Sequence, residues 1–130
     1  MSKRKYTGIN IQYPISQAIV EGKKTIETRT YPIPAHLVNQ ELLIIETPGK
    51  EGKFTARIIG SVVFGESFQY KTADAFYADT PKHLVTPDSV WAFSSKKPKF
   101  GWTVSQVRAF KKPLPAPKKK GIKFTKNIQI

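Results

Sequence analysis

The chain contains no cysteine, and its last acidic residue is Asp88. The absence of cysteine excludes disulfide bonds, catalysis by a thiol and zinc sites built on thiolates. No run of about 18 apolar residues occurs, so the sequence predicts no membrane-spanning helix. The basic N-terminal residues are not followed by an apolar segment, so a secretory signal is not expected. We therefore expect a cytoplasmic protein.

Positive charge is what the sequence has in excess. Twenty-two Lys and Arg residues stand against nine Asp and Glu residues, which gives a net charge of +13. Residues 89–130 hold eleven of the basic residues and none of the acidic ones. This charge favours binding to polyanions, and nucleic acid is a better candidate than an anionic membrane. A basic protein without any polyanionic partner is the alternative.

The length of 130 residues suits one domain with one hydrophobic core. An aromatic content of 12% argues against a disordered chain. We assign residues 1–115 to the domain and residues 116–130 to a basic, proline-stiffened C-terminal arm, which could pack back on the domain. A flexible solubilising tail is the other interpretation of this arm. A monomer is expected.

The hydrophobic patterns predict an α+β fold that is mainly β. Strands are expected over residues 7–13, 24–30, 41–47, 54–68, 91–95 and 101–110. Pro14 suits the first turn of a helix that Gly22 would end, and Thr72 suits the N-cap of a second short helix. These elements predict a small closed or half-closed β-barrel with two or three short helices.

An unusual polar run follows the first predicted helix. If residues 24–29 are extended, Glu27 and Arg29 share one face of the strand and Lys24 lies on the other. Together with Lys23, these groups could hold a phosphate, bond to a base edge or move a proton. The alternative is a solvated strand face with surface ion pairs worth roughly 0–1 kcal/mol each.

The segments "GINIQYP", "IVEGKKTIETRTYPIP" and "ELLIIET" together resemble an ASCH domain of the PUA-like superfamily. The hallmark of that family is a Gly-x-Lys-x-x-Glu-x-Arg run, met here by Gly22, Lys24, Glu27 and Arg29. The resemblance extends over about residues 7–115, through "SVVFG" and "FGWTVSQVRAFKKPLP". It implies a PUA-like β-barrel with a cleft beside the first helix, lined by the motif, and RNA or a nucleotide-like ligand.

The resemblance leaves catalysis open, because family members differ in activity. Some cleave single-stranded RNA, and a small relative removes the acyl group from N4-acetylcytidine. If this chain is an enzyme, the resemblance implies a metal-independent hydrolase in which Lys24 is the acid or base. The amidohydrolase carries a threonine where this chain has Glu27, and Glu66 is only a loose match for its catalytic glutamate.

Other candidate ligand-binding residues come from aromatic and basic side chains. Tyr31 and Trp102 could stack on unpaired bases, although most aromatic residues of a small β domain lie in its core. Lys97 and Lys99 precede Phe100 in a basic stretch that suits a phosphate backbone; an exposed hairpin tip is the alternative. Trp91 is a further aromatic worth testing.

The two histidines, His36 and His83, have neither the spacing of metal ligands nor a nucleophile beside them. A mechanism with paired histidines would require the fold to bring them together. We expect no cofactor and no metal site.

Overall fold

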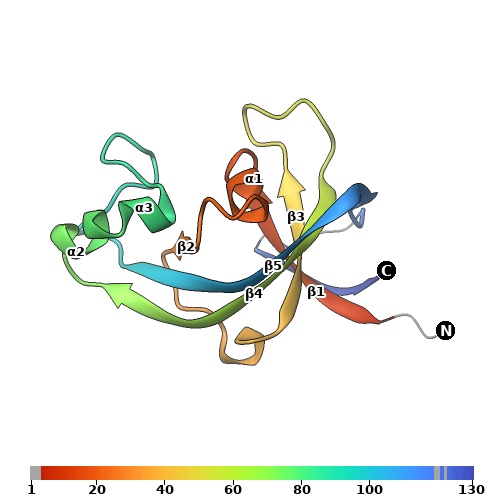
Figure 1. Cartoon of the computed structure of the whole chain (residues 1–130), viewed down its shortest axis with the longest axis horizontal. Coiled ribbons are helices and arrows are strands. Elements are labelled where there is room, and N and C mark those ends of the chain that lie inside the picture. Colours follow the sequence, from red (N-terminus) through yellow and green to blue (C-terminus); the bar gives the residue numbers. More distant parts are fainter. Residues whose placement is uncertain (1–3, 119–120, 122) are drawn as a thin grey trace.

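The protein is built on one six-stranded sheet with short helices around it (Figure 1). A computed structural model describes residues 4–118, 121 and 123–130. Its elements in chain order are β1 (Lys5–Gln12), α1 (Ile15–Val20), β2 (Ile26–Arg29), the 3-10 helix η1 (Ala35–Leu37), β3 (Glu41–Thr47), β4 (Arg57–Tyr70), α2 (Ala73–Ala78), α3 (Thr80–His83), β5 (Lys99–Pro115) and β6 (Phe124–Gln129). Within the described residues, no helix has the length and apolarity needed to cross a membrane.

The strand order across the sheet is β2-β5-β4-β3-β1-β6, and among the strands that the structure describes β1 with β3 is the one parallel pair. The long strands β4 and β5 pair antiparallel along most of their length, with three register shifts. Gly60 lies at one shift, and a Cβ there would come within 2.3 Å of the Arg108 carbonyl oxygen. Glycine therefore permits the close approach at which the two strands bend around the core.

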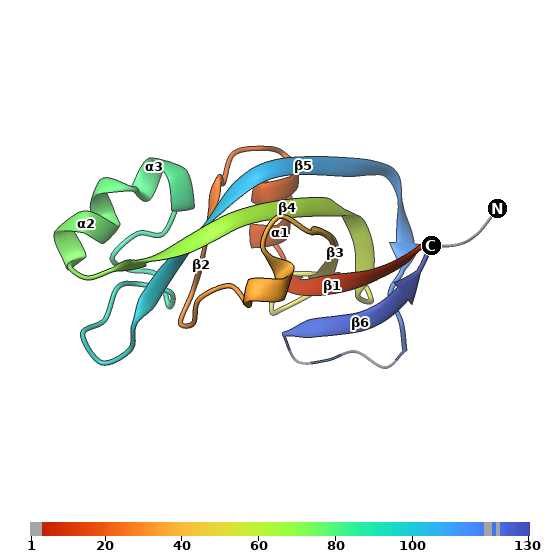
Figure 2. The ribbon, with the colours of Figure 1, turned by 90° about the horizontal axis from the view of Figure 1, so that it is seen from below.

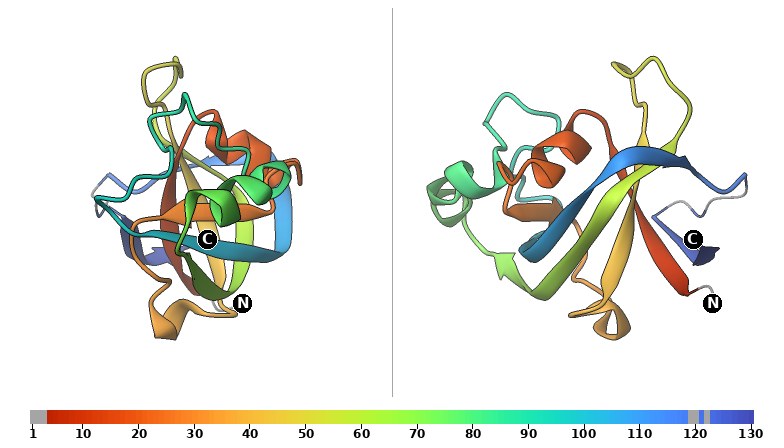
Figure 3. Two further views of the ribbon diagram at one scale, coloured as in Figure 1. Left: turned by 90° about the vertical axis from the view of Figure 1, so that its left-hand side faces the viewer. Right: turned by 45° about the vertical axis from the view of Figure 1, so that its right-hand side comes forward.

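The predicted barrel is not closed. The sheet is strongly curved (Figures 2 and 3), yet within the described residues no backbone ladder joins its edge strands β2 and β6. The reason is that β2 has only four residues, which pair with the first part of β5. Side chains span the gap instead: the Lys123 ammonium lies 4.1 Å from the centroid of the Tyr31 ring, and Trp102 and Phe124 stack at 6.2 Å.

The core lies on both faces of β3, which explains why this strand is an unbroken apolar run. Leu42 and Ile44 pack on one face, in a cluster with Trp102. Leu43 and Ile45 pack on the other face, in a smaller cluster with Ile58 and Ile128. Successive residues of a strand point to opposite faces, so this part of the sheet is buried on both sides.

A buried carboxylate fixes α1 against the sheet. Glu46 on β3 is fully buried; it accepts hydrogen bonds from Ser16 at 2.6 Å and Gln17 at 2.7 Å, and Arg57 approaches its other oxygen at 2.8 Å. Burial alone would raise the pKa of Glu46, but these hydrogen bonds lower it, so the carboxylate stays charged. After α1 the chain turns at Gly22 with a φ of +78°, as predicted.

The region between β4 and β5 differs from the sequence prediction. Residues 91–95 form no strand; among them only Ser94 makes an isolated bridge, to Lys97. The predicted helix at Thr72 is present as α2, and Thr72 accepts a hydrogen bond from the Ala75 amide at 3.1 Å. A small separate cluster centred on the buried Phe76 holds this region together. Phe93 packs against that cluster instead of forming part of a strand.

Candidate functional site

A cleft of about 850 Å³ opens on one side of the sheet. Its walls come from the end of β1, from α1 and β2, from the β3–β4 loop and from residues 83–91. Figure 1 shows α1, the β3–β4 loop and the α3–β5 connection rising on the same side of the sheet. A cavity of this size suits one small ligand.

The floor of the cleft contains the predicted motif. Lys24 and Glu27 are 4% and 5% exposed, and the Lys24 ammonium lies 4.0 Å from Glu27 Oε1. Arg29 contacts the other carboxylate oxygen through Nε at 3.0 Å and through a terminal nitrogen at 2.9 Å. The interpretation as a solvated strand face does not fit these burials. The motif forms a compact, desolvated ionic group.

Further hydrogen bonds fix the three side chains. Lys24, which precedes β2, donates to the backbone carbonyl oxygen of His83 and ties the segment before β2 to the end of α3. Arg29 donates to the Tyr31 hydroxyl at 3.1 Å and to the Asn10 carbonyl oxygen at 3.0 Å. The guanidinium therefore joins β2 to β1 across the open side of the sheet.

Burial shifts the acid–base properties of the floor. Burial lowers the pKa of Lys24; the charge of Glu27 opposes this, and the charges of Arg29 and Lys99 add to it. Burial also acts to lower the pKa of Arg29, but Glu27 and Tyr31 outweigh it and the net pKa is raised. Arg29 therefore stays charged, whereas Lys24 loses its proton more readily than an exposed lysine.

Lys99 differs from the exposed phosphate-binding lysine that the sequence suggested. It opens β5, is 7% exposed and does not line the cleft. Burial lowers its pKa, the charge of Glu27 raises it, and the charge of Lys97 lowers it. Lys99 is thus a third cation whose charge acts on Glu27 from within the fold, while Lys97 is exposed on the preceding loop.

The prediction of Trp102 as a base-stacking residue is wrong. Its side chain is fully buried, with Phe64 packed against it and its indole N–H donating to the Tyr31 carbonyl oxygen at 3.1 Å. Trp91 instead is 46% exposed and lines the cleft. Tyr31 packs edge-on against Trp102 and is half-buried beside Arg29, outside the lining of the cleft.

Two other candidates lie away from the cleft. Lys23 is exposed and pairs with Glu21 at 3.2 Å. Glu66 is exposed on β4 and does not line the cleft. Apart from Glu27, the acidic residue in the cleft lining is Glu51 in the β3–β4 loop, which the sequence interpretation assigned only to a turn.

His83 has a structural environment. It is fully buried: its Nε2 lies 2.6 Å from the Phe76 carbonyl oxygen, and its Nδ1 accepts the Val85 amide at 2.9 Å. Both ring nitrogens are thus engaged by the backbone, and burial lowers the pKa of His83. His36 is exposed on η1. Within the described residues, no group of three His, Asp or Glu side chains could hold a metal ion.

The C-terminal segment adjoins the cleft. Asn10, which lines the cleft, donates its backbone N–H to the Lys123 carbonyl oxygen at 3.0 Å and its side-chain amide to the Gly121 carbonyl oxygen at 2.6 Å. The Lys123 ammonium lies over Tyr31, which is bonded to Arg29. Residues 119, 120 and 122 of the predicted arm lie outside the described residues, and the rest ends in β6, paired with β1.

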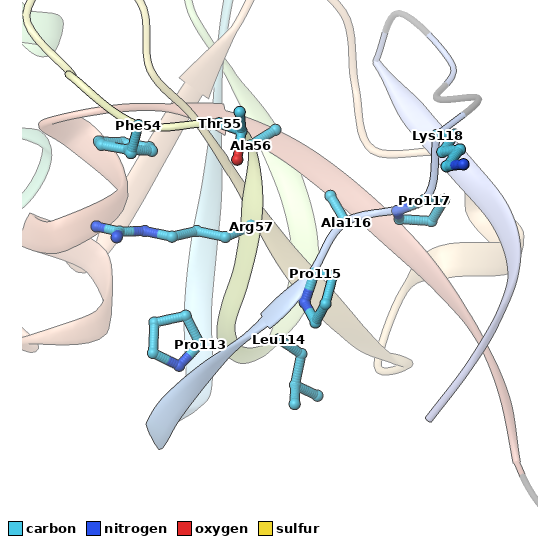
Figure 4. A pocket seen from close by; sticks show the side chains of 10 residues that line it. All are labelled: Phe54, Thr55, Ala56, Arg57, Pro113, Leu114, Pro115, Ala116, Pro117 and Lys118. Atoms are coloured by element: carbon cyan, nitrogen blue, oxygen red, sulfur yellow. The ribbon is translucent and has the colours of Figure 1, made fainter.

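A second, shallower groove of about 470 Å³ lies between the start of β4 and the end of β5 (Figure 4). Arg57 extends between Phe54 and Pro113 in this groove, 4.0 Å from the centroid of the Phe54 ring. Its guanidinium is already paired with Glu46 at 2.8 Å. The rest of the lining is mainly proline, leucine and alanine. The charged side chains that could bind a ligand are therefore concentrated in the first cleft.

The comparisons with known proteins agree on the fold. The ASCH domain model matches residues 9–113. The crystal structure of ASCH from Zymomonas mobilis superposes with a TM-score of 0.63 at 19% identity, covering 85% of this chain and 73% of that chain. A serine-to-alanine variant of the same protein gives a TM-score of 0.63 at 18% identity, covering 97% and 90%. No curated protein matches the sequence. Because the family model spans most of the chain, this protein belongs to the ASCH domain family.

Proposed function

We propose that this protein binds single-stranded RNA, with one nucleotide in the cleft and the adjoining backbone on the C-terminal segment. The observation that carries the proposal is the buried ionic group of the cleft floor, in which Lys24 and Arg29 share the single carboxylate of Glu27. Such a group attracts anions, and it lies in a cavity of nucleotide-compatible size.

Two features favour a nucleic acid over an isolated anion. Trp91 lines the cleft with nearly half of its surface exposed, and an exposed indole can stack on an unpaired base. Lys123 lies next to the Arg29 network, and Lys118 and Lys126 are exposed on the same C-terminal segment. These lysines suit the phosphates that follow the bound nucleotide.

Binding is tested by fluorescence anisotropy with an internally labelled single-stranded RNA. We expect the logarithm of the association constant to fall linearly with the logarithm of salt concentration, by about 0.7 per phosphate neutralised. Trp91→Ala should weaken binding by about 1–3 kcal/mol if the indole stacks on a base. Phe68→Ala, which removes an exposed aromatic ring outside the cleft lining, is the matched control. Undetectable binding at low salt would refute the proposal.

Ribonuclease activity is a second candidate because the pKa of Lys24 is lowered within the cleft. A general acid or base works best when its pKa lies near the working pH. A denaturing gel in the presence of EDTA tests this: RNA shortened by the wild-type protein but not by Lys24→Ala would establish a metal-independent nuclease. Intact RNA in both lanes would exclude cleavage of that substrate.

Amidohydrolysis of a modified nucleoside has weaker support. Glu27 occupies the position at which the amidohydrolase relative carries a threonine, and its two oxygens already face Lys24 and Arg29. Glu66, the loose match for the third catalytic residue, lies outside the cleft lining. Release of acetate from N4-acetylcytidine by the purified protein would restore this function.

A further inference from the structure

The buried charges at the cleft floor do not balance when Lys99, which lies outside the cleft lining, is counted with them. Lys24, Arg29 and Lys99 are cations, and among the described residues Glu27 is the one carboxylate whose charge raises the pKa of either lysine. The exposed fractions of the two lysines and of Glu27 do not exceed 7%. With all four groups charged, the cluster carries an excess of two positive charges. Such an excess is unfavourable in a desolvated site, and an anionic ligand would relieve it.

The excess of two positive charges favours a terminal phosphomonoester over a phosphodiester. A phosphate within a strand is a diester with a single negative charge. A terminal phosphomonoester carries about −1.5 to −2 near neutral pH and offers three acceptor oxygens. The monoester matches the excess charge of the floor more closely. Its oxygens can accept from the Lys24 ammonium and lie near the positive charge of Arg29, whose three nitrogens already donate to Glu27, Tyr31 and Asn10.

The shape of the cleft also favours a terminal phosphate over a phosphate within a strand. Its floor is closed behind Lys24, which donates to the backbone of the fully buried His83. Its rim is open at Val90 and Trp91, which are 88% and 46% exposed. A phosphate within a strand has a nucleotide on each side, and both would have to follow it to the floor. A terminal phosphate can enter first and leave its nucleotide at the rim.

On the basis of the proposed RNA binding, we infer that the cleft recognises a phosphorylated strand end. The terminal phosphomonoester lies against Lys24 and Arg29, and the terminal base lies against Trp91 at the rim. The remaining strand leaves the cleft toward Lys123, which the Tyr31 ring connects to the Arg29 network. The same chemistry is present at a 5′-phosphate and a 3′-phosphate, and the experiment separates the two.

The experiment compares one internally labelled RNA of about ten nucleotides in four forms: with a 5′-phosphate, with a 3′-phosphate, with hydroxyls at both ends, and circularised. We expect one phosphorylated form to bind at least tenfold more tightly than the hydroxyl-ended and circular forms. Lys24→Ala should abolish this difference between the phosphorylated and the hydroxyl-ended forms. Lys71→Ala, which loses the same charge at an exposed site, should keep the difference.

A measurement on the wild-type protein covers the case in which Lys24→Ala does not fold. Adenosine 5′-monophosphate, adenosine 3′-monophosphate and adenosine are titrated into the protein by calorimetry, and we expect one monophosphate to bind at least tenfold more tightly than adenosine. Equal affinity for all four RNA forms would overturn the inference while RNA binding stands. Binding of a monophosphate without binding of any RNA would overturn the proposed function and retain the phosphomonoester site. Failure of every ligand would overturn both.

Discussion

Replacement of Glu27 by glutamine should strongly destabilise the protein. Glu27→Gln keeps the shape of the side chain and removes the charge that Arg29 contacts at 2.9 Å and Lys24 faces at 4.0 Å. Removing one partner of a buried ion pair costs about 3–5 kcal/mol, because the remaining charge is left uncompensated. For a domain of 130 residues, about 4 °C of melting temperature is lost per kcal/mol, so a decrease of roughly 12–20 °C is expected.

The cost of Glu27→Gln should also depend on pH. The folded-state pKa of Lys24 already lies below its ordinary value of 10.5, and without Glu27 it falls further. Between the folded pKa and 10.5 the unfolded chain binds the proton and the folded protein does not, so the Lys24 contribution to stability rises with pH. The variant enters this window at a lower pH than the wild type. The difference in unfolding free energy between the two proteins should therefore shrink as pH rises.

Both proteins are unfolded with urea at several pH values from 7 to 10, and tryptophan fluorescence monitors the unfolding. Glu66→Gln serves as the control because it removes a carboxylate from an exposed position outside the cleft. The control should change stability by less than about 0.5 kcal/mol. A cost of Glu27→Gln below 1 kcal/mol, or one independent of pH, would refute the description of the floor as a desolvated group with excess positive charge.

Three further outcomes are expected. Lys99→Met should leave thermal stability unchanged or raise it in a calorimetric melt, because it removes a desolvated cation. The same variant should bind a phosphorylated RNA end more weakly in an RNA titration. The pKa of His83 in the folded protein lies below its unfolded value of 6.5, so its contribution to stability should decline as pH falls below 6.5. In acid titrations a His83→Gln variant should lose this pH dependence, whereas a variant at the exposed His36 should keep it. Gly60→Ala should destabilise by about 1–3 kcal/mol in chemical denaturation, because its Cβ would come within 2.3 Å of the Arg108 carbonyl oxygen; wild-type stability would contradict the close approach of β4 and β5.

The sequence predicted the elements whose signals are local. The alternation around Ile9 and Ile11, the apolar run of β3 and the cap at Thr72 all specify structure through neighbouring residues. The motif spacing also indicated that Glu27 and Arg29 share a face of the strand, because residues two apart on a strand point the same way, and there the two side chains form a hydrogen bond. The sequence did not indicate that the sheet stays open, because closure depends on how far the short edge strands extend.

The parts of the site that could not be predicted depend on tertiary packing. Trp91 and Trp102 have similar apolar surroundings in the sequence, yet one is half exposed at the cleft and the other is fully buried. Lys99 follows two exposed lysines, and its burial results from pairing at the start of β5. The contribution of residues 83–91 arises because α2 and α3 place that irregular segment against the cleft. No local pattern carries this information.

The position of β6 affects how the C-terminal segment can be studied. β6 hydrogen-bonds to β1, whose Ile9 and Ile11 belong to the core, and it brings Lys123 against Tyr31. A chain shortened before Phe124 would lose charge, but it would also leave β1 as an unpaired edge open to pairing with other molecules. Weak RNA binding by such a truncation would therefore not distinguish a missing phosphate contact from aggregation. Replacing Lys118, Lys123 and Lys126 with glutamine keeps the strand in place and isolates the contribution of charge.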